Sequence, residues 1–228
     1  MAFRKKAAFI SKYKPDILIV PECEHPHKLL FDIDSVKPTQ SLWFGENKNK
    51  GLGIFAYGDY KIKLLKDHND DFKLIIPVAV TGNNIKFNLF AIWAHNPIDK
   101  DGKYITQVWK AINYYKKLMI SKPSILIGDF NSNSIWDKEH KIDSHSIVVS
   151  TLAEMGIFST YHSHHNQIQG TEKHPTFFLY KHLDKPFHLD YCFASTAIFQ
   201  KLKSVEIGKH KQWSKHSDHC PLIVTFKD

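Results

Sequence analysis

The stretch Ser124–Ser134, "SILIGDFNSNS", joins an apolar run to a group of polar side chains. Ile125–Ile127 are aliphatic residues typical of a buried strand. Asp129 and Asn131 follow at once. Because side chains alternate along a strand, these two should share one face, while Phe130 points the other way and packs. The stretch therefore predicts a core strand that delivers an acid and an amide to the rim of a cleft.

The composition is that of a folded, soluble protein. Of 228 residues, 43% are hydrophobic and 24% are charged, which excludes general disorder. No repeat, low-complexity tract or long linker divides the chain, so we expect one domain spanning residues 1–228, and a monomer. No segment approaches the roughly 20 apolar residues of a membrane span, so we expect no stable membrane insertion.

The net charge indicates the kind of partner, and the cysteines indicate the cellular compartment. Lys and Arg outnumber Asp and Glu by 31 to 23, a formal net charge of +8. This excess favours an anionic partner such as nucleic acid, although it does not identify one. Cys23, Cys192 and Cys220 are odd in number and far apart, which favours reduced thiols and a cytoplasmic location.

Short apolar, β-branched or aromatic segments are mixed with a few helical patterns. The expected strands span residues 16–22, 51–58, 72–80, 85–95, 124–130, 176–181, 187–195 and 220–226. The expected helices span residues 2–14, 102–121 and 144–156. Many strands with few helices indicate a layered α/β or α+β fold.

Polar side chains stand at the ends of several of these strands: Glu22, His95, Asp129, Asn131, Asp190, Asp218 and His219. Any one of them could be a turn cap or a hydrogen-bonded edge residue. As a set they meet the needs of phosphate-ester hydrolysis. Carboxylates hold Mg²⁺, an aspartate orients the attacking water, and amide or imidazolium groups bind phosphoryl oxygens as charge develops.

The motifs around these residues resemble those of the endonuclease/exonuclease/phosphatase family, the family of pancreatic deoxyribonuclease and exonuclease III. In chain order they read "PDILIVPE", "KGLGIFA", "AIWAHNP", "GDFNSN", "PTFFLY", "HLDYCFAS" and "SDHCPL". They span nearly the whole chain, and "GDFN" is the most specific. Pro21 departs from the glutamine that is usual there. The resemblance implies a four-layered α/β sandwich of two mixed, mostly antiparallel sheets packed face to face, with helices outside.

The resemblance also implies roles for single residues. Glu22 and Asp218 would hold Mg²⁺, with Mn²⁺ as a substitute, and Asp129 would orient the attacking water. Asp190 would orient a histidine. The residues implied to contact the scissile phosphate are Asn131, His95 and His219, and service as an acid is the alternative role for His95.

Four further residues are candidates for substrate binding. Trp136 and Phe178 would stack on a base or sugar, with core packing as the equal alternative. Lys48 and Lys50, in "FGENKNKG", would contact phosphates, although a solvated hairpin turn explains them slightly better. The histidine-rich segment 161–166, "YHSHHN", is expected to be a solvated loop rather than a zinc site.

The leading functional prediction is a divalent-metal-dependent phosphodiester hydrolase, an endonuclease or exonuclease acting on DNA or RNA. One alternative is a phosphatase or phospholipase-type hydrolase of inositol phosphates or sphingomyelin-like esters. Another is a weakly active or inactive binding protein that retains the fold. The last rests on a departure: the family begins with a strand ending in asparagine, whereas Met1 opens directly into the expected first helix. We expect the natural product to carry such a strand upstream.

Overall fold

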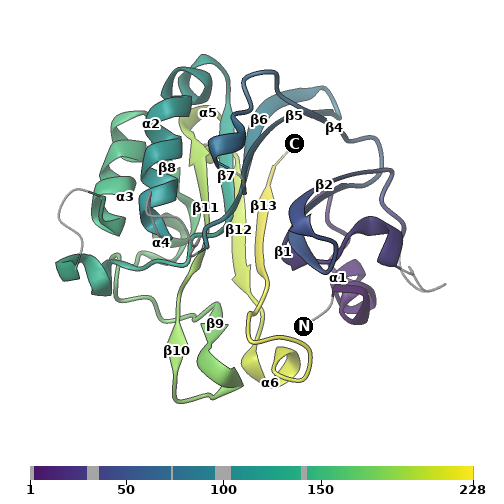
Figure 1. Ribbon diagram of the computed structural model, residues 1–228. Coiled ribbons are helices and arrows are strands. Elements are labelled where there is room, and N and C mark those ends of the chain that lie inside the picture. The colour runs from purple at the N-terminus through teal and green to yellow at the C-terminus, as the bar shows by residue number, and fades with distance from the viewer. Residues whose placement is uncertain (1–2, 30–35, 73, 96–103, 140–142, 228) are drawn as a thin grey trace. The chain divides into compact units, whose positions relative to one another are not determined.

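The computed structural model describes residues 3–29, 36–72, 74–95, 104–139 and 143–227 (Figure 1). The chain forms two compact units, residues 1–93 and residues 94–228. The expectation of one domain over residues 1–228 stays a prediction.

The first unit contains two antiparallel strand groups. One is a sheet of order β1-β3-β2, and the other runs β4-β5-β6. Their bounds are β1 Ile17–Cys23, β2 Gln40–Asn47, β3 Lys50–Ala56, β4 Lys61–Leu64, β5 Ile75–Gly82 and β6 Ile85–Trp93. The short helices are η1 Phe3–Lys5, α1 Ala7–Ser11, η2 Pro26–Lys28 and η3 Asp70–Phe72. Strand β3 is paired on both edges and is buried almost throughout.

The chain start is less helical than the sequence predicts. Instead of one helix over residues 2–14, it forms a 3₁₀ turn and then the five-residue α1. Helix α1 ends at Ser11, and Lys14 then takes a left-handed φ of 48° ahead of Pro15. Phe3 is fixed to the unit because its N–H donates to the Glu24 carboxylate and its ring packs in the core.

The second unit is built around an antiparallel strand group of order β7-β11-β8, with two further strand pairs, β9-β10 and β12-β13. Its strands are β7 Ser124–Asp129, β8 Ile157–Ser159, β9 Phe177–Phe178, β10 Pro186–Phe187, β11 Asp190–Ser195, β12 Leu202–Ile207 and β13 Leu222–Phe226. Its helices are α2 Ile105–Ser121, η4 Ser134–Glu139, α3 His145–Glu154, α4 Thr160–His165, η5 Leu179–Lys181, α5 Thr196–Phe199 and α6 His210–Trp213.

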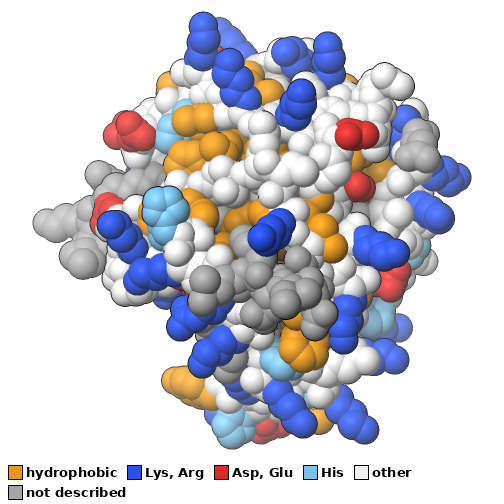
Figure 2. All heavy atoms as spheres, turned by 90° about the vertical axis from the view of Figure 1, so that its right-hand side faces the viewer, with side chains coloured by type: hydrophobic (Ala, Val, Ile, Leu, Met, Phe, Trp, Pro, Cys, Tyr) orange, Lys and Arg blue, Asp and Glu red, His pale blue; other side chains and the backbone are white. Residues whose placement is uncertain are grey.

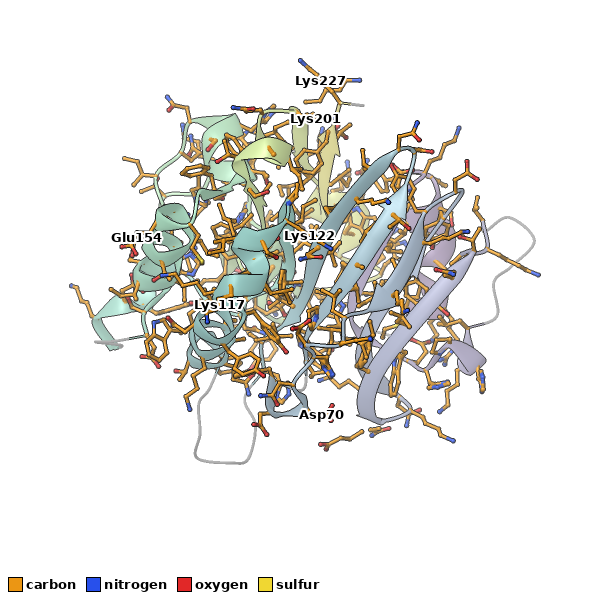
Figure 3. The ribbon with its side chains drawn as sticks, turned by 90° about the horizontal axis from the view of Figure 1, so that it is seen from above. Asp70, Lys117, Lys122, Glu154, Lys201 and Lys227 are labelled. Carbon is orange, nitrogen blue, oxygen red and sulfur yellow. The ribbon has the colours of Figure 1, made fainter. Side chains whose placement is uncertain are left out.

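Helices α2 and α3 confirm the clearest helical patterns. Val108, Ile112 and Met119 recur at helical spacing and are buried. The two helices contact one another, and their polar side chains, such as Lys117 on α2 and Glu154 on α3, are exposed (Figure 3). Ser144 caps α3 by accepting the Ile147 N–H.

Two local predictions in the second unit are wrong. The expected strand 176–181 has only the two residues of β9, because Tyr180 and Lys181 take left-handed φ values of 55° and 62°. The histidine-rich segment is helix α4 rather than a solvated loop, and the side chains of Tyr161 and His162 are buried. The mixed α/β class itself is confirmed.

Candidate active site

Two aspartates face each other at one end of the β7–β11 pair. Asp129 is the last residue of β7, Asp190 is the first residue of β11, and the two are direct cross-strand partners. Asp129 is buried at 3% exposure, and the Asp190 side chain is 16% exposed. Like charges placed directly opposite each other destabilise a strand pair. The structure must therefore supply positive charge or hydrogen-bond donors close by.

His219 supplies that charge. Its Nδ1 donates to Asp190 Oδ2 at 2.9 Å. Burial would lower the pKa of His219, but the charge and hydrogen bond of Asp190, with the charges of Asp129 and Asp218, raise it to about 9. His219 is therefore an imidazolium at neutral pH, and Nδ1 is already bonded. Its Nε2–H is the group available for an anionic ligand.

Thr176 connects the segments that carry Asp190 and His219. It is fully buried, and its hydroxyl oxygen accepts the N–H groups of Leu189 and Asp190 at 2.9 and 3.0 Å. Its carbonyl accepts the Cys220 N–H at 2.7 Å. Thr176 is not among the site residues predicted from the sequence. The available signal was a polar residue just before the aromatic pair of "PTFFLY".

Asn131 lies beside Asp129, but strand alternation is not the reason. Strand β7 ends at Asp129, and Asn131 takes a left-handed φ of 46°. Its backbone N–H donates to Asp129 Oδ1 at 2.8 Å, and its side-chain amide donates to Asp129 Oδ2 and the Ala94 carbonyl. The amide thus orients the Asp129 carboxylate. Phe130 is fully buried, as predicted.

Asp129, Asp190 and His219 form a group whose potential ligand atoms lie within 4.8 Å of one another. The two carboxylates suit a hard divalent cation such as Mg²⁺. His219 does not suit it, because a ligating imidazole must be neutral and its pKa is about 9. Asp218 is not in this group among the described residues. It contributes charge that raises the pKa of His219, and its carbonyl accepts the Phe178 N–H.

Glu22, Lys48 and Lys50 belong to the first unit. Glu22 takes a left-handed φ of 57° at an irregularity in β1, a conformation that is costly for a non-glycine residue and is often retained at functional sites. Its carboxylate is half exposed and pairs with Lys50 Nζ at 2.8 Å. Lys48 lies in the β2–β3 turn, and its side chain is exposed. The structure thus brings Glu22 and Lys50 together.

His95 follows Ala94, which is anchored to the site because its N–H donates to the Asp129 carbonyl at 2.8 Å. The His95 carbonyl accepts the Tyr104 N–H. The rest of its motif, residues 96 and 97, lies outside the described residues.

Three half-buried rings form an aromatic row that ends at His219. The ring centroids are 5.3 Å apart for Trp136 and Phe187, 6.4 Å for Phe187 and Phe177, and 4.7 Å for Phe177 and His219. Phe178, the residue selected from the sequence, is instead buried against His210. This follows from alternation in β9, which directs adjacent side chains to opposite faces. Phe177 and Phe187 were not selected.

The sequence matches no protein-family model and no curated protein. Its fold, however, is similar to that of several solved structures. A 3′ phosphatase from Neisseria, NExo, bound to a product DNA hairpin, has a TM-score of 0.67 and 17% identity, covering 99% of this chain and 96% of that chain.

Two other solved structures have a similar fold. The endonuclease domain of TRAS1, a telomere-specific non-LTR retrotransposon, has a TM-score of 0.65 and 14% identity, covering 99% of this chain and 91% of that chain. An AP endonuclease from Archaeoglobus fulgidus has a TM-score of 0.69 and 16% identity, covering 96% of this chain and 92% of that chain. The resemblance inferred from the motifs is confirmed at the level of the fold: this chain folds as this phosphatase and these endonucleases do.

Proposed function

We propose that this protein is a divalent-metal-dependent phosphodiester hydrolase that acts on nucleic acid. The observation that carries the proposal is the group formed by Asp129, Asp190 and the raised-pKa His219 at one end of the β7–β11 pair. It combines a buried carboxylate, a second carboxylate that fixes an imidazolium, and an N–H available for an anion.

The side chains divide the chemistry between them. Asp129, held by the Asn131 amide, orients the attacking water and accepts its proton. The Nε2–H of His219 donates to a phosphoryl oxygen, and Asp190 fixes the ring. Because the Asn131 amide already donates to Asp129 and Ala94, its expected phosphate contact requires an exchange of partners.

A bound Mg²⁺ would polarise the phosphoryl oxygens and offset their developing charge. Glu22, in the first unit, and Asp218, in the second, are each a candidate carboxylate ligand for such an ion. In the first unit Glu22 is already held in an unusual backbone conformation and is paired with Lys50, which a metal ion would displace as its partner.

Nucleic acid is the substrate class that we propose. The formal net charge is +8, and Lys and Arg side chains are spread over the face shown in Figure 2. The aromatic row that ends at His219 offers flat apolar surface to bases or sugars. The similar NExo structure contains a product DNA hairpin, which agrees with this choice. Among the described residues, no helix is long and apolar enough to cross a membrane.

A substrate panel tests the proposal. Purified protein with Mg²⁺ or Mn²⁺ is offered plasmid DNA, abasic-site duplex, single-stranded RNA, a 3′-phosphate DNA hairpin, inositol phosphates and sphingomyelin. We expect turnover of nucleic acid, loss of turnover in EDTA, and a loss of about 10²–10³-fold in Asp190→Asn, which deprives His219 of its charged partner. Asp184→Asn, at a 78% exposed carboxylate, is the matched control. Turnover confined to the last two substrates would overturn the proposal.

A further inference from the structure

A series of hydrogen bonds between side chains in the second unit starts at Ser132 and returns to the adjacent residue Asn133. In order from Ser132, its members are His145, Gln169, His162, Glu172 and Asn133. The five distances between hydrogen-bonded atoms, in the same order, are 3.3, 3.2, 3.1, 2.9 and 3.1 Å. Apart from Gln169, which is half-buried, these side chains are buried. We call this series the hydrogen-bond ring.

The donors and acceptors follow one direction around the hydrogen-bond ring. Burial lowers the pKa of His145 to about 4, so this imidazole is neutral at pH 7. Its Nε2–H donates to Gln169 Oε1, and its Nδ1 accepts the Ser132 hydroxyl. The Gln169 amide donates to His162 Nδ1, so His162 Nε2–H donates to Glu172. Hydrogen bonds in series polarise one another, so the ring acts as one unit.

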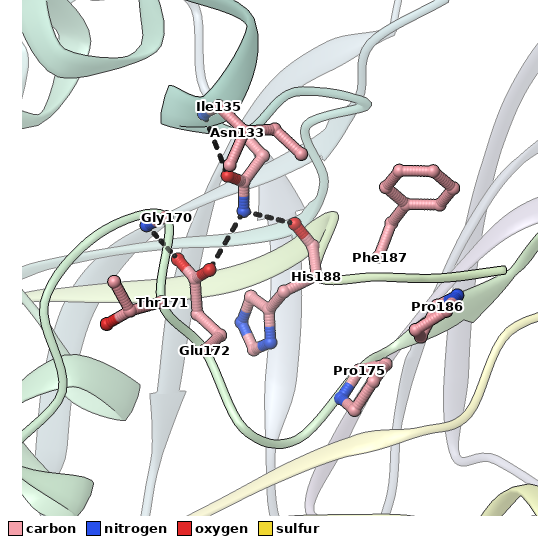
Figure 4. A pocket seen from close by; sticks show the side chains of 9 residues that line it. All are labelled: Asn133, Ile135, Gly170, Thr171, Glu172, Pro175, Pro186, Phe187 and His188. Atoms are coloured by element: carbon pink, nitrogen blue, oxygen red, sulfur yellow. Dashed lines mark hydrogen bonds between the residues drawn. The ribbon is translucent and has the colours of Figure 1, made fainter. Parts of the chain in front are cut away.

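Glu172 is the carboxylate at which this series of donors ends. Its Oε1 accepts from His162 Nε2–H and from the Gly170 N–H, both at 2.9 Å. Its Oε2 accepts from the Asn133 amide at 3.1 Å (Figure 4). Burial would raise the pKa of Glu172, but these hydrogen bonds lower it to about 2, so the carboxylate is ionised. Because hydrogen bonds to a charged acceptor are the stronger ones, Glu172 fixes the position of Asn133.

Asn133 connects Glu172 to the turn that follows β7. Its Oδ1 accepts the Ile135 N–H at 3.1 Å, and its amide also donates to the His188 carbonyl at 3.1 Å (Figure 4). The same amide donates to the hydroxyl of Tyr191, which follows Asp190 on β11, at 3.1 Å. The turn is thereby bonded to the strand that begins with Asp190.

Asn131 lies in the same turn, directly before Ser132. Its left-handed φ of 46° is costly for a residue other than glycine, so neighbouring contacts must hold it. In this conformation its side-chain amide donates to Asp129 Oδ2 at 2.9 Å. The next two residues, Ser132 and Asn133, are the two ends of the hydrogen-bond ring. The ring therefore fixes the backbone from which the Asn131 amide reaches Asp129.

We propose that Glu172 is a positioning residue: through the hydrogen-bond ring and Asn133 it holds the turn that directs the Asn131 amide to the Asp129 carboxylate. The inference rests on the proposed function, in which Asp129 orients the attacking water. The effect of Glu172 on turnover passes through Asn131, so its loss should lower kcat and leave KM nearly unchanged.

A double-mutant cycle tests this dependence on Asn131. Glu172→Gln removes the charge and keeps the size of the side chain, and we expect kcat to fall about 10–100-fold with KM within about twofold of wild type. In an Asn131→Ala background the same substitution should change kcat by less than about twofold, because the positioned group is absent. Equal reductions of kcat in both backgrounds would overturn the proposal.

A second variant covers the case in which Glu172→Gln does not fold, since loss of one partner of a buried charge is strongly destabilising. Asn133→Ala breaks the connection to the turn and leaves the hydrogen bond between Glu172 and His162 in place. It should lower kcat in wild type but not in the Asn131→Ala background. Met119→Ala, at a buried apolar residue of α2, is the control for lost stability and should keep the wild-type kcat.

Nuclear magnetic resonance gives a readout that does not depend on turnover. The side-chain amide signals of Asn131 are assigned by their loss in Asn131→Ala. We expect their chemical shifts to change in Glu172→Gln or Asn133→Ala and to stay the same in Met119→Ala. Unchanged shifts in both folded ring variants would overturn the positioning role. Changed shifts in a protein that hydrolyses no phosphodiester would overturn the hydrolase and keep the positioning role.

Discussion

At the scale of single residues, the site is organised around one electrostatic conflict. Asp129 and Asp190 are opposed across a strand pair, and the charge of His219 and two hydrogen bonds donated by Asn131 offset their repulsion. A bound metal ion would relieve the same repulsion. The groups that stabilise the resting site are thus those that would balance the charge of a bound phosphate.

The role of Asn131 leads to a first prediction. Asn131→Ala removes the side-chain donor to Asp129, so the carboxylate loses its fixed orientation. We expect turnover to fall by about 10²–10³-fold with little change in substrate affinity. Asn113→Ala, at an exposed residue of α2, is the control. Steady-state kinetics on the best substrate of the panel measure both parameters. A change in KM alone would contradict an orienting role.

A second prediction concerns His145, a buried residue at the start of α3. Burial lowers the pKa of His145 to about 4, despite its hydrogen bond with Gln169. The charged or titratable groups that also act on it are Asp137, Glu172 and His162. Between pH 6.5 and 4 the unfolded chain binds a proton there that the folded chain does not bind. The stabilisation is therefore complete above pH 6.5 and is lost as the pH falls to 4.

Denaturant unfolding of wild type and His145→Gln measures this effect. Relative to the variant, wild type should lose on the order of 3 kcal/mol of unfolding free energy between pH 7 and pH 4. Other titrating groups cancel in the difference between the two proteins. If the free energies of unfolding of the two proteins changed with pH in parallel, folding would not lower the pKa of His145.

The residue types of the site were predictable from the sequence, but their partners were not. Asp129, Asp190 and His219 occur in short motifs that can be read directly, and the structure brings them together. Phe178 is buried, which agrees with core packing, the alternative given for it, while Phe177 contacts His219. Thr176 acts through main-chain partners that are distant in the sequence.

At the scale of elements, the site depends on the start of β11 and on two segments with little regular structure, residues 176–178 and 218–220. Residues 176–178 bridge to residues 218–220, and Thr176 also holds the start of β11. Thr176 thus links Asp190 to His219, with its hydroxyl bonded to the start of β11 and its carbonyl bonded to the Cys220 N–H. Strands this short have few ladder hydrogen bonds, so a side-chain acceptor has a large share in their geometry.

Thr176→Val tests this link with a side chain of the same shape. Two buried N–H groups lose their acceptor, at a cost of about 1–3 kcal/mol each. We expect a lower melting temperature and a kcat about 10–100-fold below wild type. Thr176→Ser, which keeps the hydroxyl, should restore kcat, and Thr225→Val on β13 is the control. If Thr176→Val lost stability but kept full kcat, Thr176 would be structural only.

Long, buried elements were predicted and short ones were not. β5, β6, β7, α2 and α3 have enough residues for their periodicity to be read. Strands such as β4, β8 and β10 have two to four residues and depend on their neighbours for hydrogen bonds. Helix α4 was not predicted, because the polar residue His162 is buried through its hydrogen bonds with Ser159 and Glu172.

At the scale of the whole molecule, the excess of basic residues should appear as salt dependence. The logarithm of nucleic-acid affinity should fall linearly with the logarithm of salt concentration. Lys48→Gln, in the exposed β2–β3 turn, should reduce the slope on duplex DNA by about 0.9, the value for one phosphate contact. Lys117→Gln on α2 is the matched control. Affinity that does not change with salt would indicate a small or apolar ligand instead.

The central claim is that the Asp129, Asp190 and His219 group performs metal-dependent phosphodiester hydrolysis. Single-turnover cleavage of end-labelled DNA and RNA, by wild type and by a folded Asp129→Asn variant, tests it most directly. We predict cleavage by wild type in Mg²⁺, none in EDTA, recovery when Mg²⁺ is restored, and a rate at least about 10²-fold lower in the variant. Cleavage at the wild-type rate by Asp129→Asn, or by wild type in EDTA, would contradict the account.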